Sequence, residues 1–338
     1  TACQAGNYAQ ALTLHDRLFA LRWEFEGARG FAYRRGRPAA LGSMDLTNAY
    51  VEACGPLLRG GRTFHGLRFR KLTAFEELFA AEARLADTLL FHLRRFCVRQ
   101  DFDRQYALLE QIGEGSFGRV FAARRRADGS RLAVKVYEKA GLAGRGALAV
   151  KNELRVLRRL DDPRVLRFIE LYESPTQLLC VTELYNGPSL AKALPPGTAL
   201  PEPAALLLAR ELLHALAYLH AQGIVHRDVK PDNVLFKRSA DFPELVLVDF
   251  GFACELAAPP LLRRCGSLGY VAPEVLRDEP LTARADAFSA GAVLFRLLSG
   301  ELAFPGETGE EVLRANARGA VDLARLGWVA PHTRDLLR

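Results

Sequence analysis

Apolar and polar positions alternate along residues 107–138 in the pattern of β-strands, and glycines interrupt the pattern near its start. Farther along, residues 147–160 carry apolar side chains at helical spacing. Helices dominate beyond about residue 185, except for two short apolar runs, "NVLF" and "LVLVDF", that indicate strands. The hydrophobic pattern therefore predicts a strand-rich segment followed by a mainly helical one, as in an α+β protein.

Within the strand-rich segment, "RLAVKVY" places its leucine and valines on one face and Lys135 on the other. The dipeptide Asp128-Gly129 just before it predicts a hairpin turn, because both residue types tolerate left-handed backbone conformations. In the helical segment, the apolar stretch at 204–220 is interrupted by charged and polar residues, so we expect a buried amphipathic helix there.

The first hundred residues carry a weaker pattern. Four segments predict successive short strands: "DRLFALRWEF", "RGFAYRRGRPA", "LGSMDLTNAYVEAC" and "TFHGLRFRKL". The next segment, "EELFAAEARLADTLLFHLRRF", predicts an amphipathic helix, and the polar stretch at 100–106 marks a domain boundary. An alternative stays open at the start, where "GNYAQALTLHDRLFAL" has the small and aromatic spacing of half a helical repeat.

The composition, 49% hydrophobic and 25% charged residues, is that of a soluble globular protein. The six cysteines form no Cys-x-x-Cys pair, which argues against a zinc site or a disulfide framework and indicates a reducing compartment such as the cytoplasm. No run of about 18 apolar residues occurs, so no transmembrane segment is expected. Because the chain opens on Thr1 and its one methionine is Met44, we expect a fragment of a longer protein.

The net charge of +7 lies mostly in the first third of the chain. Residues 1–106 carry 16 Lys and Arg against 11 Asp and Glu, whereas residues 107–338 carry 30 against 28. A solvated, Arg-rich surface accounts for this imbalance, and an acidic partner of the first region is the sharper alternative. Zinc-finger spacing and basic grooves with interleaved aromatics are both absent from the sequence, so nucleic acid is not expected as a partner.

The segment "GEGSFGRV" at 113–120 lies between two predicted strands, not between a strand and a helix. Glycines let backbone N–H groups approach phosphate oxygens without an obstructing Cβ, so this hairpin is a candidate phosphate-covering loop. Taken alone, Gly-x-Gly-x-x-Gly is a weak signal, and a glycine-rich hairpin without a ligand is the alternative.

Glu153 falls on the apolar side of the helix predicted at 147–160, together with Val150, Leu154 and Leu157. A carboxylate in such a position is costly unless it is paired, and Lys135 is the candidate partner. A lysine held in this way can present its ammonium group to the phosphates of a nucleotide.

Two polar loops complete the candidate chemistry. In "IVHRDVKPDNVLF", Asp228 can accept a hydroxyl proton, Lys230 can neutralise a transferring phosphoryl group, and Asn233 can offer an amide oxygen to Mg²⁺. In "LVLVDFGFA", Asp249 ends an apolar strand before Gly251, which suits a ligand of a divalent metal. Each of these segments alone could be an ordinary turn or strand end without a function. The glycine-rich hairpin, the Lys135–Glu153 pair and the two polar loops, in this order and at this spacing, indicate one site.

Together these segments resemble the motif set of eukaryotic Ser/Thr protein kinases, most similar to the calcium/calmodulin-dependent group, over about 107–338. The resemblance implies a bilobal kinase fold, with a β-rich N-lobe at 107–184 and a helical C-lobe at 187–338. It also implies ATP and Mg²⁺ as cofactors and a protein substrate. Lys230, two residues after Asp228, is typical of the Ser/Thr kinases.

The resemblance assigns a role to each candidate residue. The catalytic residues are Asp228, Lys230, Lys135 and Glu153. The metal ligands are Asn233 and Asp249, and the substrate-docking loop supplies Ser267, which would steady Asp228 and Lys230. The ATP-binding residues are Ile112, Gly113, Glu114, Gly115, Ser116, Phe117, Gly118, Val120, Ala133, Lys135, Thr182, Glu183 and Leu235. His226 and Phe250 would belong to an internal hydrophobic spine.

The activation segment departs from the family pattern. Between Phe252 and Cys265 the chain has no Ser, Thr or Tyr, so no phosphate can be placed there. We therefore predict activity that does not depend on phosphorylation of this segment, with Glu255 as the candidate partner of Arg227. Ser189 stands where many relatives have an acid, which removes the basis for predicting Arg-containing substrates.

The end of the chain is a further departure. The segment "GWVAPHTRDLLR" matches the helix that precedes the last part of a kinase C-lobe, so the domain is expected to be truncated there. The arginine that would pair with Glu274 is then missing. A buried, unpaired glutamate would be destabilising by several kcal/mol. We therefore expect the natural chain to continue.

In front of the kinase domain at 101–338, strands followed by one helix resemble a pleckstrin-homology (PH) domain, a PH-like β-barrel with a C-terminal helix at 1–100. Arg34, Arg35 and Arg37 form a basic hairpin for an acidic protein surface or a phosphoinositide, with protein docking favoured. Such a module would attach the protein to a membrane or the cytoskeleton. A kinase-shaped scaffold or pseudokinase with a docking role is the alternative to an active enzyme.

Overall fold

The structure, a computed structural model, describes most of the chain from residue 97 onward and short strands before it. The described residues are 21–23, 31–34, 42–44, 50–59, 62–71, 74–80, 95, 97–115, 118–142, 144–238, 244–257 and 264–337. The chain divides into two compact units. The first comprises Thr1–Ala107, Arg124–Ser130 and Ile169–Val181, and the second comprises Leu108–Ala123, Arg131–Phe168 and Thr182–Arg338.

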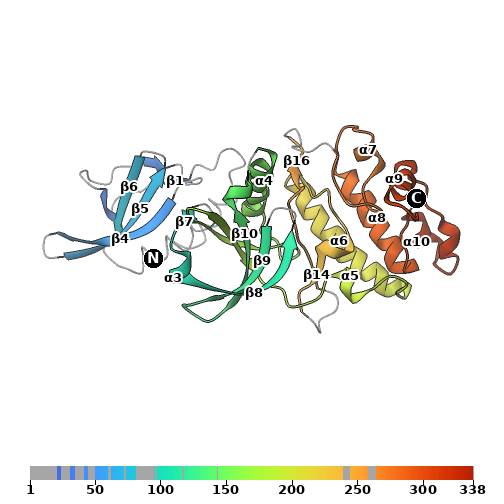
Figure 1. The fold of residues 1–338 in the computed structure, drawn as a ribbon, viewed down its shortest axis with the longest axis horizontal. Coiled ribbons are helices and arrows are strands. Elements are labelled where there is room, and N and C mark those ends of the chain that lie inside the picture. The colour runs from blue at the N-terminus through green and yellow to red at the C-terminus, as the bar shows by residue number, and fades with distance from the viewer. Residues whose placement is uncertain are drawn as a thin grey trace, which may run out of the picture. The chain divides into compact units, whose positions relative to one another are not determined.

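The described residues in the N-terminal part of the first unit form strands (Figure 1). Their bounds are β1 Leu21–Trp23, β2 Phe31–Arg34, β3 Gly42–Met44, β4 Tyr50–Arg59, β5 Arg62–Lys71 and β6 Ala74–Ala80. β5 pairs antiparallel with β4 and β6, β2 pairs with the other side of β6, and β1 pairs with β3. Each of the four segments predicted as a strand therefore contains at least one strand.

The prediction of a helix that begins at Glu76 is wrong for its first residues. Residues Ala74–Ala80 form β6, which pairs with β5 over its whole length. Backbone pairing with a neighbouring strand outweighs the helix preference of Glu, Leu and Ala in this segment. Residues 81–94 of the predicted helix lie outside the described residues, as do 6–20 of the alternative helical stretch and the basic residues Arg35 and Arg37. Among the described strands, no closed barrel is present.

A short linking segment at 97–106 continues the first unit. Its strand β7 (Val98–Arg99) pairs in parallel with β4 and, on its other side, with β11 (Phe168–Glu173). The short helix α3 (Phe102–Gln105) follows. One two-residue strand therefore joins the N-terminal ladder to β11.

Buried charge and stacked rings hold this segment in place. The Arg99 guanidinium lies 3.0 Å from a Glu170 carboxylate oxygen and 2.7 Å from one of Asp101. The Tyr106 hydroxyl donates a hydrogen bond to Glu170, and the Phe102 ring stacks on Tyr106 with centroids 5.4 Å apart. Because the Glu170 side chain is only 4% exposed, the two hydrogen bonds it accepts replace its hydration.

The strands predicted at 107–138 are confirmed. They are adjacent in the order β10-β9-β8, with bounds β8 Tyr106–Gly115, β9 Gly118–Arg125 and β10 Arg131–Glu138. The predicted turn is also present, since Gly129 has φ +73° and Asp128 accepts the Ser130 N–H at 3.0 Å. On β10 Val134 and Val136 are buried as expected and Lys135 is partly exposed, but Ala133 and Tyr137 on the same face as Lys135 are buried as well, so both faces of the strand are largely covered.

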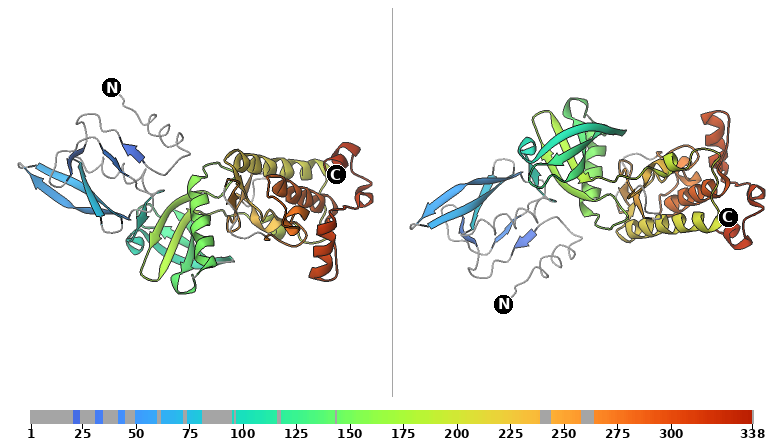
Figure 2. Two further views of the ribbon diagram at one scale, coloured as in Figure 1. Left: turned by 90° about the horizontal axis from the view of Figure 1, so that it is seen from above. Right: turned by 90° about the horizontal axis from the view of Figure 1, so that it is seen from below.

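The second unit contains α4 (Arg145–Arg159) and the helical region that follows. The other helices are α5 Leu190–Ala193, α6 Glu202–Ala221, α7 Pro273–Leu276, α8 Arg284–Ser299, α9 Gly309–Arg318 and α10 Pro331–Asp335. Figures 1 and 2 show α6 beside α8, and α6 also packs on β15 (Leu245–Leu247). β15 pairs with β14 (Val234–Phe236), so the predicted strands "NVLF" and "LVLVDF" form one ladder.

Helix α6 is the described helix that is long and apolar enough to cross a membrane by length and composition. Core helices of water-soluble proteins meet the same two criteria. The face of α6 that includes Leu208, Leu212, Leu216 and Leu219 is buried inside this structure. The buried amphipathic helix predicted at 204–220 is therefore confirmed.

Candidate active site

The glycine-rich hairpin brings the backbone close to Lys135. A Cβ on Gly115 would lie 3.6 Å from the Lys135 ammonium nitrogen. A Cβ on Gly118 would lie 2.4 Å from the carbonyl oxygen of Val136, closer than real contacts allow, so only glycine fits there. Gly113 and Glu114 precede this turn at the end of β8. The predicted residues Ser116 and Phe117 lie outside the described residues.

The ion pair expected between Lys135 and Glu153 is confirmed. The Lys135 ammonium lies 2.6 Å from a Glu153 carboxylate oxygen and 3.9 Å from one of Asp249. Glu153 is on the buried face of α4 and its side chain is 2% exposed. Burial raises the pKa of Glu153, and the Lys135 ammonium opposes this shift. The lysine therefore lies between one buried carboxylate and one at the end of a strand.

For the phosphoryl transfer that the resemblance to kinases implies, we predict that Glu153→Gln lowers the rate constant about 10²-fold, because Lys135 loses the partner that positions it. Because the pKa of Glu153 is raised in the folded state, the folded protein binds this proton more tightly than the unfolded chain does. Ionised Glu153 therefore lowers the free energy of unfolding, and this loss develops as the pH rises from the unfolded-state pKa to the folded-state pKa. The amide removes that penalty. It also leaves the Lys135 ammonium, which is 14% exposed, without its nearest carboxylate, so in urea titrations the free energy of unfolding should fall, by no more than about 3–5 kcal/mol, the cost of breaking a buried pair.

The matched control is Glu138→Gln at the exposed end of β10, where the carboxylate pairs with Arg119. This variant should keep the wild-type rate constant. If Glu153→Gln also kept it, Glu153 would have no part in positioning Lys135.

A second cluster surrounds the carboxylate of Asp228, which is 4% exposed. Ser267 donates its hydroxyl to one oxygen at 2.7 Å, and the Lys230 ammonium lies 3.0 Å from the other. Asn233 donates its amide N–H to the carboxylate at 2.9 Å and to the Asp228 carbonyl at 2.8 Å. Lys230 also donates to Ser267 at 2.7 Å. The expected contact of Ser267 with Asp228 and Lys230 is therefore confirmed.

Asp286 on α8 holds the backbone that precedes Asp228. The Asp286 side chain is fully buried. Its carboxylate accepts the backbone N–H groups of His226 and Arg227, both at 2.8 Å, and lies 2.9 Å from the His220 ring nitrogen. Arg227 has φ +69°, an uncommon conformation for a residue other than glycine. Charge-assisted hydrogen bonds to both N–H groups stabilise that strained turn.

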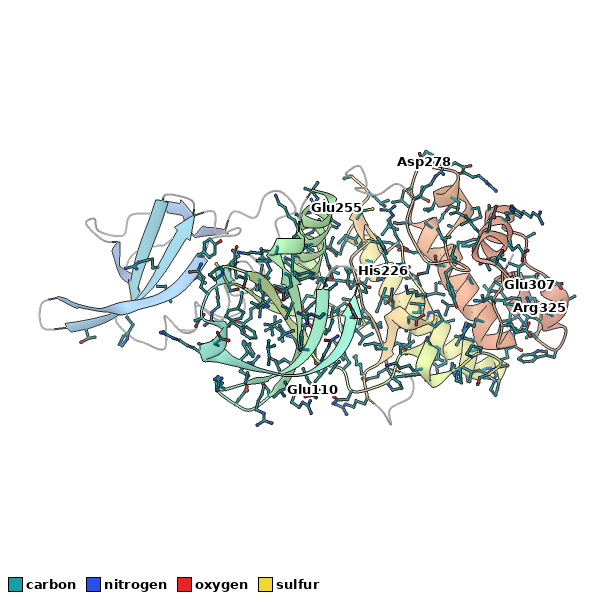
Figure 3. The ribbon with its side chains drawn as sticks, in the orientation of Figure 1. Glu110, His226, Glu255, Asp278, Glu307 and Arg325 are labelled. Carbon is teal, nitrogen blue, oxygen red and sulfur yellow. The ribbon has the colours of Figure 1, made fainter. Side chains whose placement is uncertain are left out.

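The contact expected between His226 and Phe250 in the internal hydrophobic spine is also present. The rings of His226 and Phe250 meet edge to face at 5.0 Å, and both residues are buried (His226 is labelled in Figure 3). His226 also contacts the Val248 carbonyl at 3.1 Å. These contacts join the loop of Asp228 to the strand end that carries Asp249.

Asn233 and Asp249 are brought together by the pairing of β14 with β15, and the Val248 N–H donates to the Asn233 carbonyl at 2.9 Å. Asp249 is 34% exposed and has φ +63°. Among the described residues no group of three or more His, Cys, Asp or Glu side chains is arranged to hold a metal. One carboxylate and one amide oxygen fit Mg²⁺ that arrives with nucleotide phosphates, because Mg²⁺ keeps few protein ligands.

Five of the residues predicted to bind ATP come from five strands. Ile112 is 44% exposed, Ala133 and Thr182 are buried, and Val120 and Leu235 are half-buried. They lie on β8, β10, β12 (Gln177–Glu183), β9 and β14. Glu183 follows Thr182 at the end of β12, and its carbonyl accepts the Thr182 hydroxyl at 3.4 Å. The ATP-binding role of these residues stays a prediction.

The activation segment contains contacts that sequence reasoning missed. Glu255 lies on β16 (Cys254–Glu255), which pairs with β13 (Ile224–Val225). Arg227 was the expected partner of Glu255. The Glu255 carboxylate instead contacts two arginines of α4, Arg159 at 2.7 Å and Arg155 at 3.4 Å. The Arg227 guanidinium lies beside the Cys254 thiol, whose pKa is raised by burial.

Two other departures from the family pattern have structural outcomes. Ser189 is buried and caps α5 by accepting the Lys192 N–H at 3.3 Å. Glu274 was expected to be buried, but its side chain on α7 is partly exposed to solvent. Solvent reduces the cost of an unpaired carboxylate, so the expected large destabilisation does not follow.

Comparison with known proteins agrees with this geometry. Residues 106–335 match the family described as "Protein kinase domain". CBL-interacting protein kinase 4 of Oryza sativa subsp. japonica is 39% identical over 245 residues, 69% of this chain and 52% of that protein. Serine/threonine-protein kinase ATG1a of Arabidopsis thaliana is 36% identical over 60% of this chain and 32% of its own length.

Calcium/calmodulin-dependent protein kinase type 1B of Rattus norvegicus is 32% identical over 71% of this chain and 70% of its own length. The chain therefore spans about half of the rice protein's length, a third of the Arabidopsis protein's and most of the rat protein's. The match to the family covers more than half of the chain. We conclude that this chain belongs to the protein kinase family, with a sheet-rich N-lobe and a helical C-lobe.

Proposed function

We propose that this chain is an ATP-dependent protein kinase that transfers the γ-phosphoryl group of ATP to Ser or Thr hydroxyls of a protein. The supporting observation is the Asp228 carboxylate, which is buried and hydrogen-bonded by Ser267 and Asn233 beside the Lys230 ammonium. These donors fix the direction of the carboxylate before any substrate arrives. Such preorganisation suits a group that must orient a hydroxyl and accept its proton.

In the reaction, the substrate oxygen forms a bond to the γ-phosphorus while the bond from that phosphorus to the bridging oxygen of ADP breaks. Asp228 orients the hydroxyl and receives its proton, and Lys230 balances the charge on the moving phosphoryl group. Lys135, fixed by Glu153, would hold the α- and β-phosphates. Asn233 and Asp249 would hold Mg²⁺, which neutralises phosphate charge when bound.

The direct test uses the whole chain, radiolabelled ATP and a generic protein such as casein. With Mg²⁺ we expect label on Ser and Thr, and with EDTA we expect none. If no label is transferred and ATP with Mg²⁺ does not raise the melting temperature, the scaffold alternative holds.

Activity is further proposed to be independent of phosphorylation in the activation segment. The absence of Ser, Thr and Tyr between Phe252 and Cys265 supports this. Ser267, the next hydroxyl, already bonds Asp228 and Lys230. Treating the enzyme with a phosphatase should leave its rate unchanged. Activating phosphate at Ser267, found by mass spectrometry, would contradict the proposal.

The N-terminal strands are proposed to act as a docking module, of PH type, for an acidic protein surface, with phosphoinositide as the competing ligand. The net positive charge of residues 1–106 supports this. The module would place a cytoplasmic enzyme on a membrane or on the cytoskeleton. Sedimentation with phosphoinositide vesicles, compared with neutral ones, separates the two ligands, because only lipid recognition predicts vesicle binding.

A further inference from the structure

The carboxylate of Glu255 joins the activation segment to two consecutive turns of α4. It lies 2.7 Å from the Arg159 guanidinium and 3.4 Å from that of Arg155 (Glu255 is labelled in Figure 3). The Glu255 and Arg159 side chains are 20% and 23% exposed, so the pair is mostly withdrawn from water. Such shielding strengthens an ion pair relative to one on an open surface.

A third contact lies on the same side of α4. One turn before Arg155, the Asn152 amide donates to the Ala253 carbonyl at 2.5 Å. Arg155 in turn donates to the Asn152 side-chain oxygen at 3.0 Å. Residues 152, 155 and 159 are spaced three and four apart, so they share one helix face. This face of α4 contacts the activation segment at Ala253 and Glu255. Glu153, on the same helix, contacts Lys135.

The charge of α4 explains why a carboxylate is needed at this place. The sequence of α4 contains five Lys and Arg residues and only one acid, Glu153. Glu153 is already paired with Lys135. Two arginines of α4, Arg155 and Arg159, therefore pair with the carboxylate of Glu255 on β16. Neutralising Glu255 would leave the partly buried Arg159 guanidinium, and beside it the more exposed one of Arg155, facing the activation segment without that charge.

We propose that Glu255 is a positioning residue: its fixed charge holds α4 where Glu153 reaches Lys135. This inference rests on the proposed kinase function and concerns how the site is kept assembled. Elsewhere, an added phosphate orders a segment by pairing with arginines. Here the carboxylate is encoded in the sequence, and β16 is anchored on its other side by β13, which leads directly to the loop of Asp228.

The test compares full-length wild type, Glu255→Gln and Glu255→Asp. With Glu255→Gln we expect the turnover number to fall about tenfold, equal to about 1.4 kcal/mol in the barrier. The KM for the protein substrate should stay within about twofold, because the proposed role of Glu255 is to position α4 and not to bind the substrate. Glu255→Asp keeps the charge and should retain most of the rate. The exchanged pair Glu255→Arg with Arg159→Glu should restore at least part of the rate that Glu255→Gln loses.

Hydrogen exchange gives a readout that does not need activity. Amides of α4 should exchange about tenfold faster in Glu255→Gln than in wild type. The matched control is Glu310→Gln, which removes an exposed carboxylate that pairs with Arg314 and should change neither rate nor exchange. Unchanged exchange in Glu255→Gln overturns the proposal, whatever the rate. If exchange is faster in Glu255→Gln but the wild-type protein transfers no phosphate, only the proposed kinase function is overturned.

Discussion

Asp228→Asn is expected to lower the turnover number of phosphoryl transfer about 10²- to 10⁴-fold while the protein stays folded. The amide has nearly the same shape as the carboxylate but carries no negative charge and cannot receive the hydroxyl proton. Ser267 and Asn233 now donate to the two oxygens of Asp228, at 2.7 and 2.9 Å. An asparagine can accept only on one oxygen, so the fixed direction of the group is weakened as well.

The measurement is initial-rate transfer of label to casein at saturating ATP, with the melting temperature recorded for each variant. Asp232→Asn is the matched control, because Asp232 lies four residues away in the same loop and is exposed. It should keep the wild-type rate. Equal rates for wild type and Asp228→Asn would remove Asp228 from the reaction and with it the proposed function.

The contacts of the candidate site were largely predictable because short spacings determine them. Asp228, Lys230 and Asn233 lie within six residues, so their loop has few ways to fold around one carboxylate. Glu153 could be paired with Lys135 across 18 residues because a carboxylate on an apolar helix face needs a partner. The contact of Ser267 followed from the resemblance to kinases and not from spacing.

The arginines that bind Glu255 could not be found in this way. Arg155 and Arg159 are 100 and 96 positions from Glu255, and they lie in a helix whose basic residues look like a solvated surface. No helical or strand period relates positions so far apart. A signal was present in the charge count of α4, because five basic residues against one acid call for a counter-charge elsewhere.

The first unit shows a different limit. Strand positions were predicted there from alternation, yet the predicted helix began with residues that form β6. Propensity favoured a helix, and pairing with β5 decided the outcome. The linking segment was treated as a boundary, although Glu170 in the otherwise apolar run "FIELY" was a sign of a buried charge that needs a partner.

Glu170→Ala is expected to destabilise the folded protein by up to about 3–5 kcal/mol, because it leaves the mostly buried Arg99 charge with Asp101, which is 34% exposed, as its remaining partner. Arg99 and Glu170 side chains are 12% and 4% exposed. The Tyr106 hydroxyl, which donates to Glu170, would also lose its acceptor. Burial, and after it the neighbouring Glu170 carboxylate, raises the pKa of Tyr106 in the wild-type protein.

Urea unfolding followed by circular dichroism measures this effect, and a double variant separates its causes. Arg99→Leu with Glu170→Leu replaces both charges by apolar groups and should recover most of the lost stability, because the main cost is an unpaired charge and not the missing pair. Glu110→Ala removes an exposed carboxylate that pairs with Arg131, and it should leave the unfolding midpoint unchanged. If Glu170→Ala unfolds at the wild-type midpoint, the buried cluster does not hold the linking segment to β11, and the connection rests instead on the pairing of β7 with β4 and β11 and on the hydrogen bond from Tyr50 to Glu173.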